Sequence, residues 1–158
     1  MAEYVMNVHG DIRIAVCAAA DLEEWVALRA ALWPDEPIDA LRTHAEELTR
    51  KGGDAVTFLA RDRAGAAIGF AEATLRRDYV NGCSTSPVAF LEGIYVAPAW
   101  RRCGAASLLC AAIERWGRER GCRELGSDTY LDNAASQKMH EALGFEEMER
   151  VVCYRKII

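Results

Sequence analysis

LEGIYVAPAWRRCGAA, residues 91–106, leads from a buried strand through a loop into the start of a helix. The strand spans Val88 to Val96, and Pro98 ends it because proline has no backbone N–H to donate to a sheet. The helix runs from about Gly104 to Arg120. Its apolar face comprises Leu108, Leu109, Ala112, Ile113 and Trp116. The sequence therefore predicts a strand–loop–helix unit in the second half of the chain.

The first turn of this helix has the composition of an anion site. A helix N-terminus presents unbonded backbone N–H groups and a partial positive charge, and both suit phosphate oxygens. Gly104, Ala105 and Ala106 let the backbone come close to a ligand, and Arg101 and Arg102 add charge. Small residues at a helix start also serve plain packing. The loop by itself leaves both interpretations open.

The rest of the chain predicts strands and helices around that unit. Before the central unit we expect a strand at 12–16, a helix that begins after the N-cap Asp21 and ends near Trp33-Pro34, and a second helix around 41–48; Glu24 lies three residues after the cap. Strands at 56–61 and 67–75 follow, joined by the Asp62–Gly65 turn. After the unit we expect a strand at 124–128, a helix from the cap Asn133 to Gly144, and a final strand at 151–158. Hairpins come first and a βαβ-like unit later. We therefore expect an α/β (α+β) fold in one domain, 1–158, with a mixed, twisted central sheet flanked by helices.

Composition narrows the function. The 158 residues carry a net charge of -5, and no Lys/Arg block extends beyond Arg76-Arg77 and Arg101-Arg102, so we expect no nucleic-acid partner. No apolar run approaches the roughly 20 residues of a membrane span, and residues 1–10 lack a basic start followed by an apolar run. We expect a cytoplasmic protein without membrane contact. The six cysteines form no C-x-x-C pair and have no histidine at zinc-ligand spacing, which indicates free thiols and no metal.

The central unit resembles the GNAT superfamily of acetyltransferases. The acetyl-CoA signature of that superfamily, Gln/Arg-x-x-Gly-x-Gly/Ala, is matched by Arg101, Gly104 and Ala106. Residues 132–136 and 140–145 are similar to its second cofactor segment, and the order of elements agrees over nearly the whole chain. The resemblance implies an enzyme that uses acetyl-CoA as its acetyl donor.

Longer stretches resemble one family within the superfamily, the aminoglycoside 6'-N-acetyltransferases. They are LWP at 32–34, DYVNGC at 78–83, SPV at 86–88, FLEGI at 90–94, SDT at 127–129, SQK at 136–138, ERVV at 149–152 and YRK at 154–156. The resemblance implies acetyl transfer to the 6'-amino group of an aminoglycoside, which confers antibiotic resistance, and it implies a homodimer. Trp33, Tyr79, Glu92 and Asp128 match family positions that line the aminoglycoside site.

Electrostatics agrees with a polycationic acceptor. Carboxylates at the acceptor mouth would raise the local concentration of an aminoglycoside. Glu92 precedes the cofactor loop, Asp128 ends the following strand, and Glu72 is a further nearby carboxylate. Each has a plainer interpretation: Glu92 as an edge charge, Asp128 as a turn residue, and Trp33 and Tyr79 as core packing rather than aromatic walls against sugar rings.

The resemblance also assigns the cofactor residues. The pantetheine arm would hydrogen-bond the strand like an added β-strand, and Asn133 would contact that arm. The expected cofactor-binding residues are Ile94, Tyr95, Val96, Arg101, Arg102, Cys103, Gly104, Ala105, Ala106, Ser107, Asn133 and His140.

The reaction needs a neutral amine, although only about one lysine-like amine in a thousand is neutral at pH 7. Glu92 or Asp128 is the candidate base, directly or through water, and the backbone N–H of Tyr95 or Val96 is the candidate oxyanion donor. Where the superfamily often has a tyrosine that protonates the thiolate, this chain has His140. That histidine either donates a proton or only hydrogen-bonds cofactor or backbone.

We expect direct transfer in a ternary complex. Cys103 and Cys110 lie in the loop–helix region, and packing explains them better than an acetyl-enzyme does. Two other functions stay open: acetylation of another amine, such as a protein N-terminus, a lysine or a polyamine, and a non-catalytic acyl-CoA-binding module. The final strand, 151–158, is the expected exchange element of the dimer.

Overall fold

A mixed six-stranded sheet runs through the computed structural model, which describes residues 6–7 and 11–158. The strands lie in chain order, and every neighbouring pair is antiparallel except β5 and β6, which are parallel. The strands are β1 Met6–Asn7, β2 Arg13–Val16, β3 Ala55–Arg61, β4 Ala67–Arg76, β5 Val88–Val96 and β6 Leu125–Ser127. The helices are α1 Leu22–Leu32, α2 Ile38–Arg50, α3 Ala105–Glu119 and α4 Ala134–Ala142, with short 3-10 turns at Ala19–Asp21, Gly52–Asp54 and Pro98–Trp100. The predicted fold class is confirmed.

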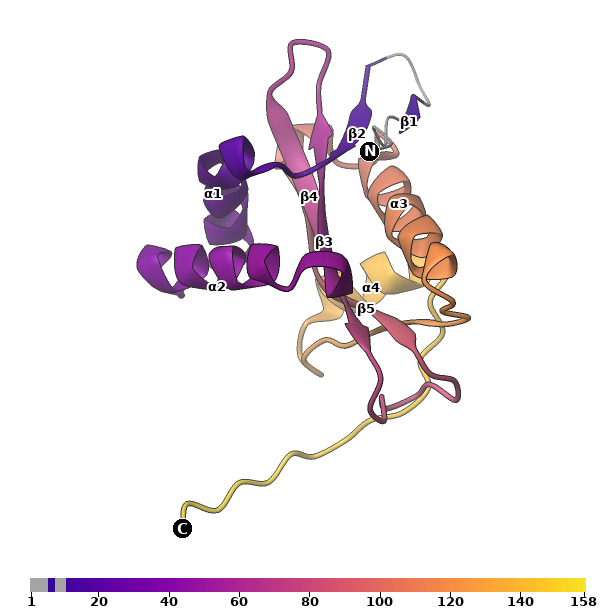
Figure 1. Ribbon diagram of the computed structural model, residues 1–158. Coiled ribbons are helices and arrows are strands. Elements are labelled where there is room, and N and C mark those ends of the chain that lie inside the picture. The colour runs from indigo at the N-terminus through magenta and orange to yellow at the C-terminus, as the bar shows by residue number, and fades with distance from the viewer. Residues whose placement is uncertain (1–5, 8–10) are drawn as a thin grey trace.

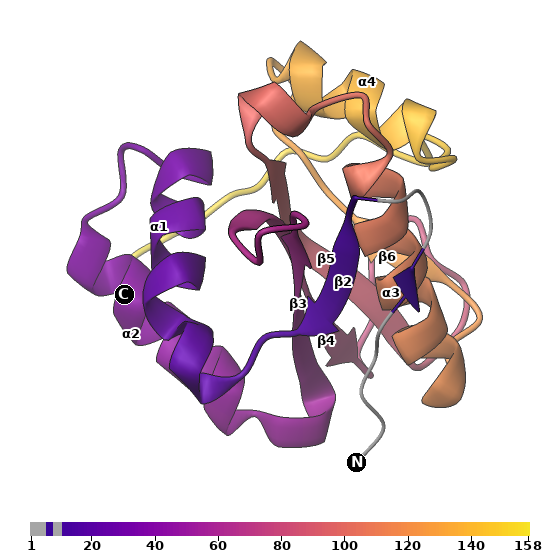
Figure 2. The same cartoon turned by 90° about the horizontal axis from the view of Figure 1, so that it is seen from above.

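Helices cover both faces of the sheet. Figures 1 and 2 show α1 and α2 on one face and α3 on the other. The larger core lies under α3, where Leu109, Ile113 and Trp116 pack against the strands. A second core lies under α1 and α2 around Trp25 and Phe70. Because β4 and β5 lie between these two cores, both strands are mostly buried, as a doubly covered sheet requires.

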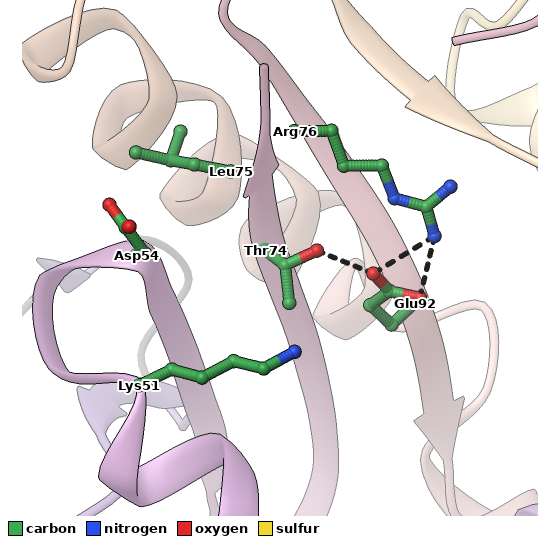
Figure 3. A pocket seen from close by; sticks show the side chains of 6 residues that line it. All are labelled: Lys51, Asp54, Thr74, Leu75, Arg76 and Glu92. Carbon is green, nitrogen blue, oxygen red and sulfur yellow. Dashed lines mark hydrogen bonds and ion pairs between the residues drawn. The ribbon is translucent and has the colours of Figure 1, made fainter. Parts of the chain in front are cut away.

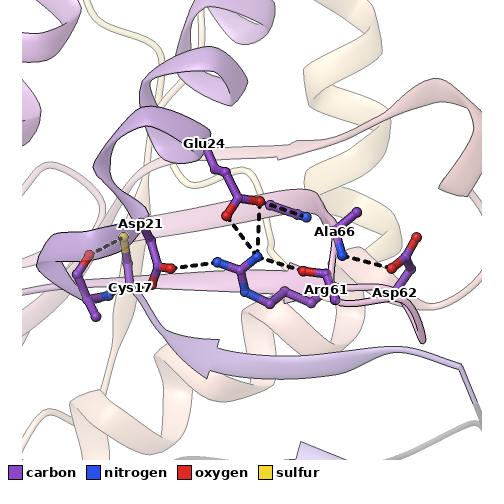
Figure 4. A network of polar contacts seen from close by, with 9 residues as sticks. Cys17, Asp21, Glu24, Arg61, Asp62 and Ala66 are labelled. Carbon is purple, nitrogen blue, oxygen red and sulfur yellow. Dashed lines mark hydrogen bonds and ion pairs between the residues drawn. The ribbon is translucent and has the colours of Figure 1, made fainter.

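The β3–β4 hairpin is anchored to the start of α1. Its turn has the predicted form, since Gly65 adopts a φ of +91° and donates its N–H to Asp62 O at 3.0 Å. Arg61, at the end of β3, forms ion pairs with Asp21 at 2.7 Å and Glu24 at 3.0 Å (Figure 4). Asp21 occupies the predicted N-cap position of α1, but its side chain makes no capping hydrogen bond and instead accepts from the backbone N–H of Ala18 at 2.8 Å.

The predicted final strand is also wrong for the single chain. Residues 145–158 have no regular secondary structure, and the end of the chain runs away from the body (Figure 1). Val152 is 76% exposed and Tyr154 92% exposed. A strand needs a neighbour to satisfy its backbone N–H and C=O groups, and no described part of this chain lies beside this segment as a strand.

The prediction that residues 1–10 lack the pattern of an export signal falls on a segment of which the structure describes only Met6 and Asn7. Within the described residues, no helix is long and apolar enough to cross a membrane.

Candidate active site

Strand β5 is paired on both edges only over its first part. Its parallel pairing with β6 ends at Leu91↔Ser127, whereas its antiparallel pairing with β4 continues to Val96↔Gly69. Over residues 92–96, one edge of β5 therefore has no described strand beside it. An extended ligand such as a pantetheine arm can add to such an edge through backbone hydrogen bonds. The predicted residues Ile94, Tyr95 and Val96 all lie on this stretch.

The loop that follows leads directly from the open edge to the N-terminus of α3. Arg102, at φ 58°, and Gly104, at φ 85°, both adopt the left-handed conformation, which glycine accepts without strain. The first amide to donate inside the helix is that of Leu108, which bonds Gly104 O at 3.0 Å. The amides of the first turn, from Ala105 to Ser107, have no intrahelical acceptor and point toward the exposed loop. This geometry fits a pyrophosphate.

Arg101 also has a structural role. Its Nε donates to Val96 O at 3.0 Å, and its guanidinium carbon lies 5.8 Å from the centre of the Tyr95 ring. The side chain therefore ties the loop back onto β5. Arg102 and Cys103 are exposed on the same loop, so the structure brings the predicted loop residues together in front of the helix.

His140 lies in α4 and is held at both ring nitrogens. Nδ1 lies 2.8 Å from Ser136 O, and Nε2 lies 2.8 Å from Ser127 Oγ. The ring meets Phe145 edge-on, with centroids 5.1 Å apart. A carbonyl oxygen only accepts, so Nδ1 carries a proton. The Ser127 hydroxyl donates to Leu91 O at 3.2 Å, so the same serine links the imidazole to β5. These contacts tie α4 to the end of β6.

Asn133 caps α4 as predicted. Its Oδ1 accepts from Ser136 N–H at 3.0 Å. This contact explains the residue as a helix cap. Its expected contact with the cofactor stays a prediction.

A bulge in β5 directs Glu92 to the face covered by α1 and α2. The β4–β5 register passes from Glu72↔Gly93 to Ala73↔Leu91, which leaves Glu92 as the extra residue. Its carboxylate accepts from Thr74 Oγ1 and from Arg76 Nη2, the latter at 3.1 Å to both oxygens. Sequence reasoning did not assign Thr74 or Arg76 to the site. The alternation along β4 is the signal that places both on this face.

These groups line an open cavity of about 560 Å³ (Figure 3). Lys51 and Asp54, from the end of α2 and the turn after it, form the opposite wall, and Lys51 extends toward Glu92. The size suits a small molecule. The cavity carries charges of both signs, whereas only carboxylates were predicted at the acceptor mouth.

Trp33 lies directly against the bulge. A Cβ atom on Gly93 would come 2.7 Å from Trp33 Cη2, so only glycine leaves room for the indole here. The indole ring also lies 4.7 Å from the guanidinium carbon of Arg29. The structure thus brings Trp33 next to Glu92. Tyr79, in the loop after β4, is 79% exposed and forms no wall comparable to Trp33.

Asp128 follows the end of β6 and is exposed. Leu91 and Ser127 are the last pair between β5 and β6, so Glu92 and Asp128 are the next residues on two adjacent parallel strands. Neighbouring strands are roughly 4.8 Å apart. The two predicted carboxylates therefore lie at the point where the strands separate.

Glu72 does not belong to the acceptor mouth, and that expectation is wrong. It is 1% exposed, forms an ion pair with buried Arg29, and accepts from Trp25 Nε1 at 3.1 Å. Burial raises the pKa of Glu72, and the Arg29 charge opposes that shift. These contacts join α1 to β4, and the carboxylate is closed off from a ligand.

The cysteines are all free. Burial raises the pKa of Cys110 to about 11 and that of Cys17 to about 12, which leaves both thiols protonated and poorly nucleophilic. Cys103 is exposed on the cofactor loop. No group of three or more metal-ligating side chains occurs in residues 6–7 and 11–158.

An open strand edge that leads into a helix N-terminus, beside an acceptor cavity, defines an acyl-CoA-dependent transferase. The chain belongs to the acetyltransferase (GNAT) family, whose model matches residues 20–145. The aminoglycoside N(6')-acetyltransferase type 1 of Salmonella enteritidis is 53% identical over 135 residues, which cover 85% of this chain and 92% of that protein. The protein of the same name from Serratia marcescens is 48% identical over 145 residues, covering 92% of this chain and 99% of that one.

Solved structures agree with these relatives. AAC(6')-Iy in complex with the bisubstrate analog CoA-S-monomethyl-acetylneamine superposes with a TM-score of 0.87 at 50% identity, over 93% of this chain and 99% of that chain. AAC(6')-Ih from Acinetobacter baumannii superposes with a TM-score of 0.88 at 43% identity, over the same shares. The family resemblance found in the sequence is confirmed.

Proposed function

We propose that this enzyme transfers the acetyl group of acetyl-CoA to the 6'-amino group of aminoglycoside antibiotics and thereby confers resistance to them. The observation that carries the proposal is the position of Glu92 and Asp128. Both directly follow the last β5–β6 pair, where the open edge of β5 begins. A donor bound along that edge would present its thioester beside two carboxylates that suit a cationic acceptor.

The residues would divide the work as follows. The first-turn amides of α3 would bind the pyrophosphate, and the backbone N–H of Tyr95 or Val96 would stabilise the oxyanion. Asp128 or Glu92 would take the amine proton, directly or through water. Attack would occur in a ternary complex; the buried Cys110 thiol, whose pKa is raised to about 11, is a poor nucleophile for an acetyl-enzyme. His140 would orient α4 or protonate the leaving thiolate.

The assembly would be a homodimer formed by exchange of residues 151–158. Strand β6 is at one end of the sheet order and is only three residues long. The C-terminal segment is exposed and carries apolar residues, among them Val152 and Ile157. Pairing with a second copy would bury these side chains and satisfy the segment's backbone groups. Deletion of residues 151–158 would then convert a dimer to a monomer in light scattering coupled to gel filtration.

The reaction would take place in the cytoplasm, where acetyl-CoA is available. A thiol-release assay with acetyl-CoA and a panel of aminoglycosides, including kanamycin and tobramycin, tests the function. We expect release with aminoglycosides that carry a 6'-amino group, and none with a 6'-hydroxyl analogue. Peptides and spermidine serve as acceptors of the other classes. Activity on either of them, without activity on any aminoglycoside, would refute the proposed substrate.

A further inference from the structure

We infer that Arg76 occupies the ammonium subsite of the acceptor cavity and must leave Glu92 when the aminoglycoside binds. The inference rests on the proposed function and adds a determinant of its selectivity. Arg76, the last residue of β4, forms an ion pair with Glu92, one of the two carboxylates proposed to meet the acceptor. An internal cation therefore holds the position that a cationic substrate needs.

The hydrogen-bonding capacity of Glu92 makes the two cations competitors. Oε1 already accepts from Thr74 Oγ1 and from Arg76 Nη2, and Oε2 accepts from the same Nη2 at 3.1 Å. Each carboxylate oxygen has about two lone-pair sites. Oε1 is therefore full, and an ammonium group that binds Glu92 through more than one contact requires the guanidinium to move. Thr74 does not compete, because its neutral hydroxyl keeps the carboxylate in place.

The surroundings of Arg76 allow this movement. The side chain of Arg76 is 40% exposed and that of Glu92 26% exposed, so the pair borders water and is weakly held. The guanidinium carbon lies 3.3 Å from the centre of the Phe90 ring, whose face remains available to the cation after it leaves the carboxylate. The buried pair Arg29–Glu72 differs in this respect, since both side chains are 1% exposed.

Competition of this kind weakens the binding of acceptors to Glu92 and selects for cations that can displace Arg76. The apparent dissociation constant equals the intrinsic one divided by the fraction of protein in which Arg76 has left the subsite. An aminoglycoside, with several ammonium groups, can displace a guanidinium. A neutral sugar amine analogue has no charge with which to do so.

Binding of tobramycin to the protein–CoA complex, measured by calorimetry, tests the inference without depending on turnover. We expect Arg76→Gln to lower the dissociation constant about three- to fivefold relative to wild type. Lys51→Gln is the matched control, because it removes the same charge from the opposite wall of the same cavity, and we expect it to lower the dissociation constant less than twofold. In a Glu92→Gln background, Arg76→Gln should give no gain.

Unchanged or weaker binding by Arg76→Gln, with an unchanged melting temperature, would overturn the inference and make Arg76 a support for Glu92. Equal gains from Arg76→Gln and Lys51→Gln would also overturn it, since the effect would then be the general field of the cavity. Arg76→Lys keeps the charge and provides a second test if the glutamine variant is unstable. We expect its dissociation constant for tobramycin to match that of wild type. If wild type neither binds nor acetylates any aminoglycoside, the proposed function itself fails.

Discussion

His140 Nε2 lies 2.8 Å from Ser127 Oγ, and Ser127 stands opposite Leu91 in the last pair between β5 and β6. The imidazole therefore fixes α4 to the strand end where the acetyl group would arrive. Nδ1 donates to Ser136 O, so both ring nitrogens are engaged by oxygens of the protein. This arrangement favours the orienting role over the general-acid role.

We predict that His140→Gln lowers kcat less than tenfold and lowers stability by about 1 kcal/mol, because it weakens hydrogen bonds that hold α4. Steady-state kinetics and urea unfolding measure the two effects. Ser127→Ala is the companion variant and should produce the same pattern. A loss of kcat of about 100-fold or more at unchanged stability would contradict this and identify His140 as the general acid.

Asp128 is predicted to act on the acceptor rather than on the cofactor. It is exposed and sits one residue beyond the β6 pairing, so its removal leaves the sheet intact. Asp128→Ala should reduce kcat/KM for kanamycin by about 100-fold or more if it serves as the base, while the dissociation constant for acetyl-CoA changes less than twofold. Calorimetry with CoA supplies the second measurement. Equal losses for both ligands would place Asp128 in a structural role.

The central unit could be predicted from sequence because its signals are local. Pro98 ends its strand and Gly104 begins its helix through their own backbone properties. The Asp62–Gly65 turn likewise needs no distant partner. Asp21 stands at the predicted N-cap position, but its side chain does not cap α1, because Arg61, on a strand forty residues later in the chain, attracts its carboxylate. Glu72 was misassigned because its partner Arg29 lies on another element and is buried with it.

Two other features depend on relationships that one sequence does not contain. The contact of Arg76 with Glu92 requires the bulge that turns Glu92 toward β4, and a bulge leaves no clear mark in the sequence. The segment 151–158 has a strand-like sequence but no strand to pair with in its own chain. Composition shows that the segment is apolar, but it does not show that the segment lacks a neighbouring strand among the described residues.

Gly93 is predicted to set the position of Trp33. A methyl group at this residue would lie 2.7 Å from Trp33 Cη2, and the guanidinium carbon of Arg29 lies 4.7 Å from the centre of the indole ring. Gly93→Ala should therefore displace the indole, raise the KM for aminoglycosides several-fold and cost about 1–3 kcal/mol of stability. Gly53→Ala is the control, since no atom lies within 4 Å of a Cβ there. An unchanged KM in a folded Gly93→Ala enzyme would exclude Trp33 from the acceptor wall.

His44 predicts how stability depends on pH. Its Nδ1 lies 2.9 Å from Arg29 Nη2, and burial, followed by the Arg29 charge, lowers the pKa of His44 below its ordinary value of 6.5. In the pH range below 6.5, the unfolded chain therefore binds a proton more readily than the folded protein does. Stability is greatest above 6.5 and falls as the pH drops toward the folded-state pKa.

Urea unfolding at pH 7.5 and at about pH 5.5 measures this dependence. Wild type should lose more stability between the two values than His44→Gln, because glutamine does not titrate and still accepts a hydrogen bond from Arg29. The difference between the two proteins isolates His44 from the carboxylates, which titrate in both. If both proteins lost the same stability, His44 would have the same affinity for a proton folded and unfolded. Burial and the Arg29 charge would then have no effect on the proton affinity of His44.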